Sequence, residues 1–157
     1  TVLGYSFIEQ DKFHINIPYI KKVGLLNNPL LSDLQKGKDV VWQGKKIKAK
    51  DATTRSPGKK ITFITDTKYC ENAVKLAKNA DVLICESTYM EDLKDKAKEF
   101  KHMTTKEAAK IAKKANVKQL IITHYSQRYK DIKLLEAEAK TVFPKTIASH
   151  DFMVYKV

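Results

Sequence analysis

Two short apolar stretches of this chain each end on a residue that can bind a metal ion. Residues 61–65 read Ile-Thr-Phe-Ile-Thr and precede Asp66, and residues 119–123 read Gln-Leu-Ile-Ile-Thr and precede His124. Such runs favour buried strands, and an open α/β sheet carries its chemistry at the carboxyl ends of its strands. A carboxylate and an imidazole at adjacent strand ends are two metal ligands on one rim. The sequence therefore predicts part of a metal site, whose remaining ligands are absent from this chain.

His102 is a candidate proton donor. It lies in a polar segment just before a predicted helix, where an imidazole can protonate a leaving oxygen. Glu86 ends another predicted strand, and its carboxylate would orient that imidazole and keep it protonated. Each assignment alone has an ordinary structural alternative. An aspartate after a strand is more often a helix cap, and a lone histidine such as His14 is more often a surface residue.

The segment after His124 suits a phosphate group. Arg128 offers a bidentate fork and Ser126 a hydroxyl, and Tyr129 follows them directly. At a bend near the end of the chain, either His150 or Asp151 could support a ligand. We therefore expect phosphate-binding side chains beside the predicted metal ligand.

The elements that would position these residues alternate between strand and helix after residue 59. Strands are predicted at 61–65, 81–86, 120–123, 146–149 and 152–157, helices at 70–79, 105–115 and 131–143, and a polar connection at 87–101. Thr104 or Thr105 is the expected N-cap of the middle helix. Earlier in the chain we predict strands at 2–9 and 12–16, an irregular to helical segment at 17–36, and a hairpin around 43–45.

The later strands are apolar on both faces, which is typical of a sheet covered on both sides. The helices of this chain can cover one face, and nothing in the sequence remains for the other. We therefore expect an α/β fold whose sheet needs a partner sheet, from a longer chain or from a second subunit.

Composition limits the class of protein. The 157 residues are 43% hydrophobic and 31% charged, and no apolar run approaches the roughly 20 residues that cross a bilayer. Cys70 and Cys85 form no disulfide framework, and Cys85 is expected to be a buried thiol, which favours a reducing cytoplasm. No signal peptide is visible, but the chain starts at Thr1 rather than at Met, which leaves open what precedes it.

The net charge of +12 favours a polyanionic partner, with nucleic acid first. The alternative is an ordinary lysine-rich surface, because only Arg55 and Arg128 among the 30 basic residues are arginine. A local cluster of basic residues is better evidence for such a partner than the net charge of the whole chain. Six lysines crowd a stretch that holds one acid, Asp39; they are Lys36, Lys38, Lys45, Lys46, Lys48 and Lys50.

Five segments that carry the candidate residues follow one another in a specific order. They are residues 64–67 (Ile-Thr-Asp-Thr), 83–88 (Leu-Ile-Cys-Glu-Ser-Thr), 102–104 (His-Met-Thr), 122–129 (Ile-Thr-His-Tyr-Ser-Gln-Arg-Tyr) and 149–153 (Ser-His-Asp-Phe-Met). They resemble the Gly-Asp-Thr, Leu-Ile-His-Glu-Ala-Thr, His-Ser-Thr, Thr-His-Phe-Ser-x-Arg-Tyr and Ala-x-Asp-x-Met segments of ribonuclease Z, the tRNA 3′-end endonuclease of the metallo-β-lactamase superfamily. The resemblance runs over the whole chain but covers only the C-terminal half of such an enzyme.

The chain departs from the family pattern at several positions. Cys85 stands for a histidine and Met103 for a serine, while the glutamate and the threonine of the second segment are kept. Asn28 stands for the glycine of the Gly-Pro element in the arm that grips tRNA; asparagine tolerates a left-handed backbone. The family's His-x-His-x-Asp-His cluster and a later zinc histidine would lie upstream of Thr1, so this chain alone is expected to be inactive.

The resemblance implies a fold, a reaction and roles. The fold would be half of an αββα sandwich, with residues 1–157 as the C-terminal portion of a metallo-β-lactamase-like domain and residues 12–35 as an inserted exosite arm. The reaction would be removal of the 3′ trailer from precursor tRNA by a cytoplasmic homodimer that holds two Zn²⁺ ions per complete site and does not enter a membrane. The implied roles are metal ligands at Asp66 and His124, catalysis at His102 and Glu86, substrate binding at Ser126, Arg128, Tyr129 and Asp151, and an exosite at Gly24, Asn28 and Pro29. A non-catalytic RNA-binding fragment and a superfamily hydrolase acting on another phosphoester are the alternatives.

Overall fold

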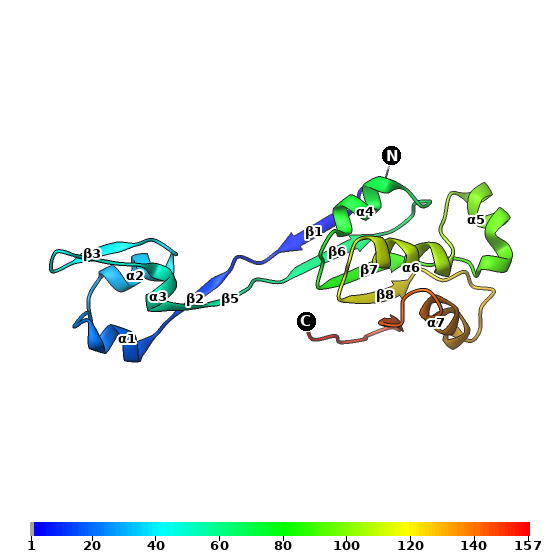
Figure 1. Ribbon diagram of the computed structural model, residues 1–157. Coiled ribbons are helices and arrows are strands. Elements are labelled where there is room, and N and C mark those ends of the chain that lie inside the picture. The colour runs from blue at the N-terminus through cyan, green and yellow to red at the C-terminus, as the bar shows by residue number, and fades with distance from the viewer. Residues whose placement is uncertain (1) are drawn as a thin grey trace. The chain divides into compact units, whose positions relative to one another are not determined.

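The chain forms two compact units in the computed structural model, which describes residues 2–157. The first unit holds the residues up to 8 together with residues 59–157, and the second holds residues 9–58. The elements of both units are labelled along the chain in Figure 1. None of the helices in residues 2–157 is both long enough and apolar enough to span a membrane.

The first unit is built on a five-stranded mixed sheet. Its strands lie in the order β1 (Tyr5–Ile8), β6 (Lys60–Ile64), β7 (Val82–Glu86), β8 (Gln119–Thr123) and β9 (Thr146–Ala148). β1 is antiparallel to β6, and the other neighbours are parallel. Cys85 pairs in register with Ile64 on one side and with Ile122 on the other. The carboxyl ends of β6, β7 and β8 therefore meet at one edge of the sheet, as the α/β prediction required.

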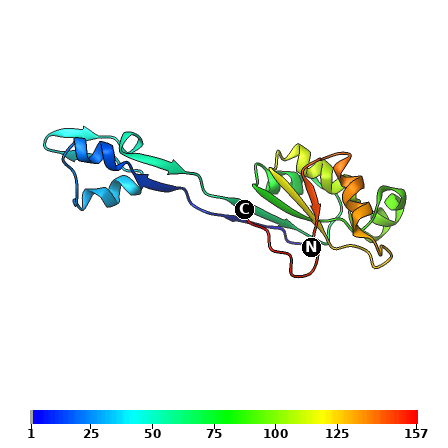
Figure 2. The same cartoon turned by 90° about the horizontal axis from the view of Figure 1, so that it is seen from below.

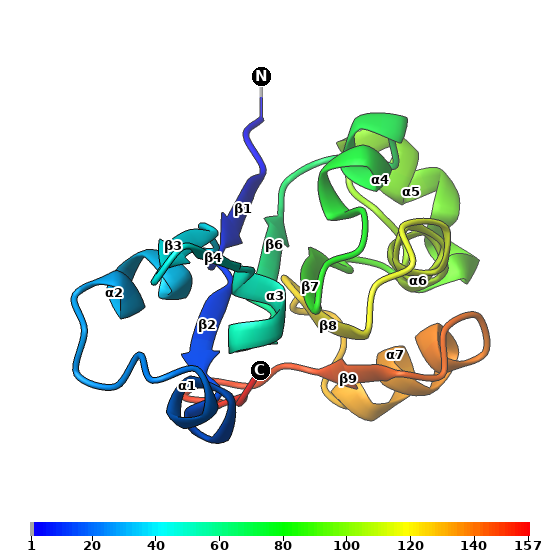
Figure 3. The same ribbon diagram turned by 60° about the vertical axis from the view of Figure 1, so that its left-hand side comes forward.

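Helices pack against one face of this sheet (Figure 3). They are α4 (Glu71–Ala77), α6 (Thr105–Lys114) and α7 (Ile132–Lys140), with η1 (Glu91–Leu93) and α5 (Lys94–Phe100) in the segment before α6. Side chains such as Leu83, Leu120 and Ile111 are fully buried in the core between the sheet and these helices. α6 begins with a capping box between Thr104 and Glu107, as predicted.

Among the described residues of the first unit, no helix lies on the opposite face of the sheet (Figure 2). Side chains alternate along a strand, so Tyr5, Phe7, Phe63 and Ile84 project to this face. Tyr5 and Phe7 are 53% and 67% exposed. Large apolar side chains at this exposure agree with the prediction that this chain covers only one face of its sheet.

Three predictions about elements of this unit were wrong. Residues 87–101 were expected only as a polar connection, but η1 and α5 lie within them. α7 ends at Lys140, before Pro144, rather than at residue 143. Residues 152–157 form no strand: Phe152 has a left-handed backbone and is fully exposed, so the chain leaves the sheet there.

The second unit, residues 9–58, contains two small antiparallel pairs. β2 (Lys12–Ile15) pairs with β5 (Thr53–Ser56), and β3 (Val40–Trp42) pairs with β4 (Lys45–Ile47). The short helices are α1 (Ile17–Lys22), α2 (Leu30–Gln35) and α3 (Ala49–Ala52). The β3–β4 hairpin matches the prediction, and both residues of its turn, Gln43 and Gly44, have positive φ. The range expected for the arm, residues 12–35, is only part of this unit.

The two ends of the second unit approach each other closely. A Cβ atom at Gly58 would lie 1.9 Å from the carbonyl oxygen of Glu9. Close to this point, the Asp11 carboxylate accepts hydrogen bonds from the Gly58 amide at 2.9 Å and from Arg55 Nε at 2.6 Å. Only glycine fits at position 58 without moving the backbone.

Candidate metal centre

Asp66 and His124 lie together at the carboxyl edge of the sheet. His124 Nε2 is 3.0 Å from Asp66 Oδ1. His102 joins them, and one ligand atom from each of the three side chains lies within 4.8 Å of the others. The His102 and His124 rings are 5.3 Å apart between centroids. The structure thus brings together a carboxylate and two imidazoles from three separate segments.

Both strand-end residues have a left-handed backbone. Asp66 has φ of 51° and His124 has φ of 59°. This region is costly for residues other than glycine, and such residues concentrate at functional sites. The chain turns abruptly at these residues, just after β6 ends at Ile64 and β8 ends at Thr123. The turns leave both side chains at the edge of the sheet, where 58% of the Asp66 side chain and 42% of the His124 side chain are exposed.

Glu86 is the buried acceptor behind this cluster, with no exposed surface. Its carboxylate accepts hydrogen bonds from the amide of Thr67 at 2.5 Å and from the amide of Met103 at 3.0 Å. His102 Nδ1 lies 3.1 Å from Glu86 Oε2. A buried charge is tolerated when hydrogen bonds satisfy it, and these donors fix Glu86 between the two segments that carry Asp66 and His102.

Two residues for which the sequence predicted no role, Thr88 and Tyr89, complete the surroundings. The Thr88 hydroxyl lies 2.8 Å from Glu86 Oε2 and 3.0 Å from His124 Nδ1. The Tyr89 ring packs edge-on against the His102 ring, with 6.3 Å between the ring centroids. The Arg128 guanidinium lies over the Tyr89 ring, 5.3 Å from its centroid, in a cation–π contact. Alternation beyond the end of β7 could have pointed to Thr88, since it lies two residues after Glu86.

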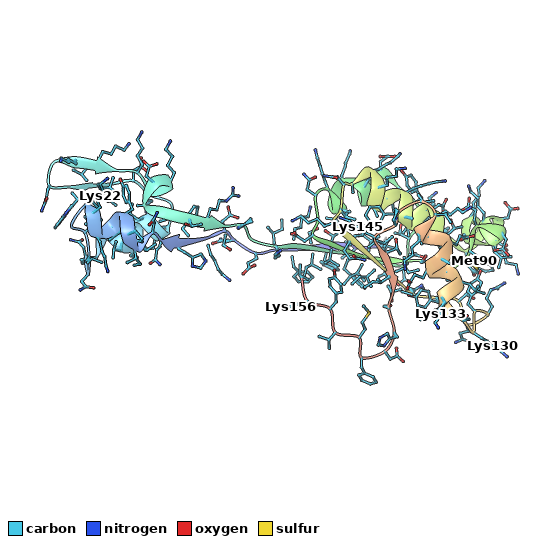
Figure 4. All side chains as sticks on the ribbon, turned by 60° about the horizontal axis from the view of Figure 1, so that its bottom comes forward. Lys22, Met90, Lys130, Lys133, Lys145 and Lys156 are labelled. Carbon is cyan, nitrogen blue, oxygen red and sulfur yellow. The ribbon has the colours of Figure 1, made fainter. Side chains whose placement is uncertain are left out.

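The residues expected to bind phosphate form a chain of contacts beside His102. Arg128 Nε donates to Ser126 Oγ at 3.1 Å. The Tyr129 hydroxyl accepts a hydrogen bond from the Met90 amide at 2.8 Å, and burial raises the pKa of this phenol. Tyr129 therefore supports the backbone after β7 and keeps its proton near neutral pH. Figure 4 shows Lys130 and Lys133 at the same end of the unit as Met90, which adds positive charge there.

Asp151 lies beside His124 at a separate pocket. This open pocket of about 500 Å³ is lined by both residues; its other lining residues are Thr123, Tyr125, Ile132, Ser149 and His150. The Tyr125 hydroxyl donates to the carbonyl of Ile122 at 2.5 Å, which holds the ring against the end of β8. Asp151 is thus near the candidate metal ligand, while Arg128 stacks on Tyr89.

The exosite residues expected in the second unit lie on turns. Gly24 has a φ of 71°, and no atom lies within 4 Å of the Cβ position it lacks. Asn28 does not adopt the left-handed backbone expected of it; Asn27 does, with φ of 53°. Asn28 Oδ1 instead accepts a hydrogen bond from the Leu30 amide at 3.0 Å, and Pro29 is the N-cap residue of α2.

The donor set fits a divalent metal. Carboxylate oxygen and imidazole nitrogen are ordinary ligands of Zn²⁺, and the supporting contacts of Glu86 and Thr88 are those that orient such ligands. Because Asp66 and His124 are about half exposed, the cluster is open on one side to further ligands.

Comparisons with known proteins agree with this geometry. Residues 40–125 match the family described as the beta-lactamase superfamily domain. Ribonuclease Z from Protochlamydia amoebophila is 40% identical over 98% of this chain and 50% of its own length, and ribonuclease Z from Archaeoglobus fulgidus is 41% identical over 99% of this chain and 52% of its own length. The crystal structure of the short form of human tRNase Z matches with a TM-score of 0.50 and 32% identity, over 71% of this chain and 36% of that one.

The chain spans about half the length of the curated relatives it matches. These relatives confirm the resemblance to ribonuclease Z that the five ordered segments indicated. The mixed sheet, covered by helices on one face, agrees with half of the fold of that family. Together with the matched residues 40–125, these findings show that the chain belongs to the beta-lactamase superfamily.

Proposed function

We propose that the protein containing this chain is a zinc-dependent endoribonuclease that removes the 3′ trailer from precursor tRNA. The observation that carries this proposal is the cluster of Asp66, His102 and His124, supported from behind by buried Glu86. The ribonuclease Z relatives, which match nearly the whole chain, support the choice of tRNA as substrate.

Asp66 and His124 are the residues that would hold zinc. Asp66 would offer a carboxylate oxygen and His124 would offer Nε2. When bound, the metal ions supply Lewis-acid polarisation of the phosphodiester and activation of a water for in-line attack. Ligands from the remainder of a complete protein would close the open side of the cluster.

His102 would protonate the departing 3′ oxygen of the tRNA body. Its Nδ1 is engaged by the Glu86 carboxylate, which leaves the other ring nitrogen to donate a proton. The side chain of His102 is 23% exposed, so it is partly shielded but reachable by a substrate. Glu86 orients the ring through this contact.

Arg128, Ser126, Tyr129 and Asp151 would position phosphates near the cut. Lysines between residues 36 and 50 would hold the tRNA backbone by charge, and Lys36, Lys38, Lys45 and Lys50 among them are exposed. Gly24, Asn28 and Pro29 would form the exosite in the same unit. The apolar open face of the sheet suits further protein, and the resemblance implies a cytoplasmic homodimer.

Cleavage of a precursor tRNA by the complete protein tests this proposal. We expect a single cut that releases the 3′ trailer, loss of cutting on treatment with a chelator, and recovery on adding Zn²⁺. A protein that binds the precursor without cutting it at any zinc concentration would instead be the non-catalytic RNA-binding alternative. Cutting of a simple phosphodiester but not of precursor tRNA would favour the other alternative, a superfamily hydrolase that acts on another phosphoester.

A further inference from the structure

Thr88 connects the candidate metal ligand to the buried carboxylate. Its side-chain oxygen lies 2.8 Å from Glu86 Oε2 and 3.0 Å from His124 Nδ1, and the residue is 6% exposed. Water therefore has little access to this hydroxyl, and its two contacts decide how it is oriented.

The single proton of the hydroxyl determines the direction of both hydrogen bonds. Glu86 accepts the amide protons of Thr67 and Met103, so its carboxylate acts as an acceptor throughout. An ionised carboxylate has no proton to give, so the Thr88 hydroxyl must donate to Glu86. The remaining lone pairs of the Thr88 oxygen can only accept, and the proton that they accept must come from His124 Nδ1.

A histidine with its proton on Nδ1 carries its free lone pair on Nε2 when the ring is neutral. Nε2 of His124 is the atom that lies 3.0 Å from Asp66 Oδ1, inside the candidate metal cluster. We propose that Thr88 is a positioning residue that fixes the tautomer and ring orientation of His124 so that Nε2 faces the metal. Through Thr88, the same Glu86 carboxylate that orients His102 also orients this ligand.

The backbone of Thr88 is held independently of its hydroxyl. The Thr88 carbonyl accepts a hydrogen bond from the Ser126 amide at 3.0 Å. Valine has nearly the same shape as threonine, so Thr88→Val removes the hydroxyl and leaves this backbone hydrogen bond and the local packing in place. The substitution therefore separates the positioning role from a general structural one.

The inference rests on the metal site of the proposed function, but its test does not need RNA cleavage. Zinc affinity of the complete protein is measured by competition with a chromophoric chelator for wild type, Thr88→Val and Thr88→Ser. We expect Thr88→Val to weaken zinc binding about 10- to 100-fold and Thr88→Ser to restore it. Thr62→Val is the matched control, because Thr62 is a buried threonine of β6 whose hydroxyl forms a hydrogen bond with Ser6, away from the metal cluster.

A second measurement detects the proton on His124 directly. In the zinc-loaded wild-type protein, nitrogen NMR should detect a slowly exchanging proton on His124 Nδ1, and Thr88→Ser should keep it. Unchanged zinc affinity in Thr88→Val, or a proton-free Nδ1 in wild type, would overturn the positioning role. A wild-type protein that binds zinc but leaves precursor tRNA uncut would reject the proposed nuclease and leave the role of Thr88 standing.

Discussion

The carboxylate of Glu86 accepts the amide proton of Thr67 at 2.5 Å. Thr67 directly follows Asp66, so this one hydrogen bond joins the residue that orients the proposed acid to the loop that carries a proposed ligand. Glu86 also accepts the amide of Met103, next to His102. The proposed acid His102 and the proposed ligand Asp66 are therefore both linked to one buried carboxylate.

Replacement of Glu86 by glutamine should impair both sides of the site. Glutamine has one acceptor oxygen in place of two and adds an NH₂ group that would face the amides of Thr67 and Met103. We expect a loss of stability of about 1–3 kcal/mol, weaker zinc binding and slower cleavage. Calorimetric unfolding, zinc titration and a precursor-tRNA assay on one preparation would measure all three. Unchanged zinc binding would show that the Asp66 loop keeps its shape without Glu86.

Replacement of His102 by alanine should slow cleavage and leave the zinc content near normal. General acids contribute roughly 10²- to 10⁴-fold to rate, and we expect a loss in that range. The measurement is single-turnover cleavage together with metal analysis of the same sample of the complete protein. Because His102 lies within the three-residue cluster, a loss of zinc in this variant would make it a ligand instead and refute the acid role.

Removal of four lysines from the second unit should weaken RNA binding in a salt-dependent way. Lys36, Lys38, Lys45 and Lys50 are exposed, and each would neutralise a phosphate if it lies against the RNA backbone. Changing them to glutamine should reduce the slope of log K against log salt by about 0.7–0.9 for each phosphate that is no longer neutralised. The matched control changes four exposed lysines of the first unit: Lys75, Lys78, Lys110 and Lys113. Equal effects in the two variants would show that the lysines of the second unit act only through the total charge. A wild-type affinity that does not change with salt concentration would exclude a role for these lysines in RNA binding.

Asp81 should make stability depend on pH in the acid range. Its carboxylate accepts Lys118 Nζ at 2.7 Å and the Lys60 amide at 2.8 Å, and the hydrogen bond from Lys118 lowers the pKa of this buried group despite its desolvation. A folded-state pKa below the unfolded one stabilises the protein above the unfolded value of about 3.9, and this stabilisation is lost as pH falls through the folded value.

Asp81→Asn should therefore cost about 1 kcal/mol near pH 7, and this cost should shrink as the pH falls below about 4. Urea unfolding at several pH values measures the difference between variant and wild type. Asp95→Asn serves as control, because Asp95 is exposed on α5 and should show little change at any pH. If the loss of stability caused by Asp81→Asn were the same at every pH, the charge of Asp81 would contribute nothing to the stability.

The sequence predicted the elements with strong hydrophobic patterns and missed those without one. β6, β7, β8 and α6 have runs or stripes of apolar residues, and they appear near the predicted positions. α5 has the sequence Lys-Asp-Lys-Ala-Lys-Glu-Phe and buries only Ala97. It therefore lacks the periodic apolar residues from which a helix can be predicted. α3 and β5 have four residues each, which is too short for a pattern.

In the candidate site, too, features that depend on one stretch of sequence could be predicted, whereas contacts between distant stretches could not. Asp66 and His124 could be predicted because strand ends in a parallel sheet share an edge, and the structure places their side chains 3.0 Å apart. The hydrogen bond between Thr88 and His124 joins residues 36 positions apart. Neither residue type nor spacing indicates such a pairing; it follows only from the register of β7 against β8 and from the turn after each strand.

The left-handed backbone at Asp66 and His124 lowers the stability of the fold at the positions that provide the proposed metal ligands. Asparagine or glycine would relax this conformation at either position, so selection for heat resistance alone should favour these substitutions. Each would discard a ligand atom. A thermostable variant of this protein obtained without an activity screen should therefore be sequenced first at codons 66 and 124.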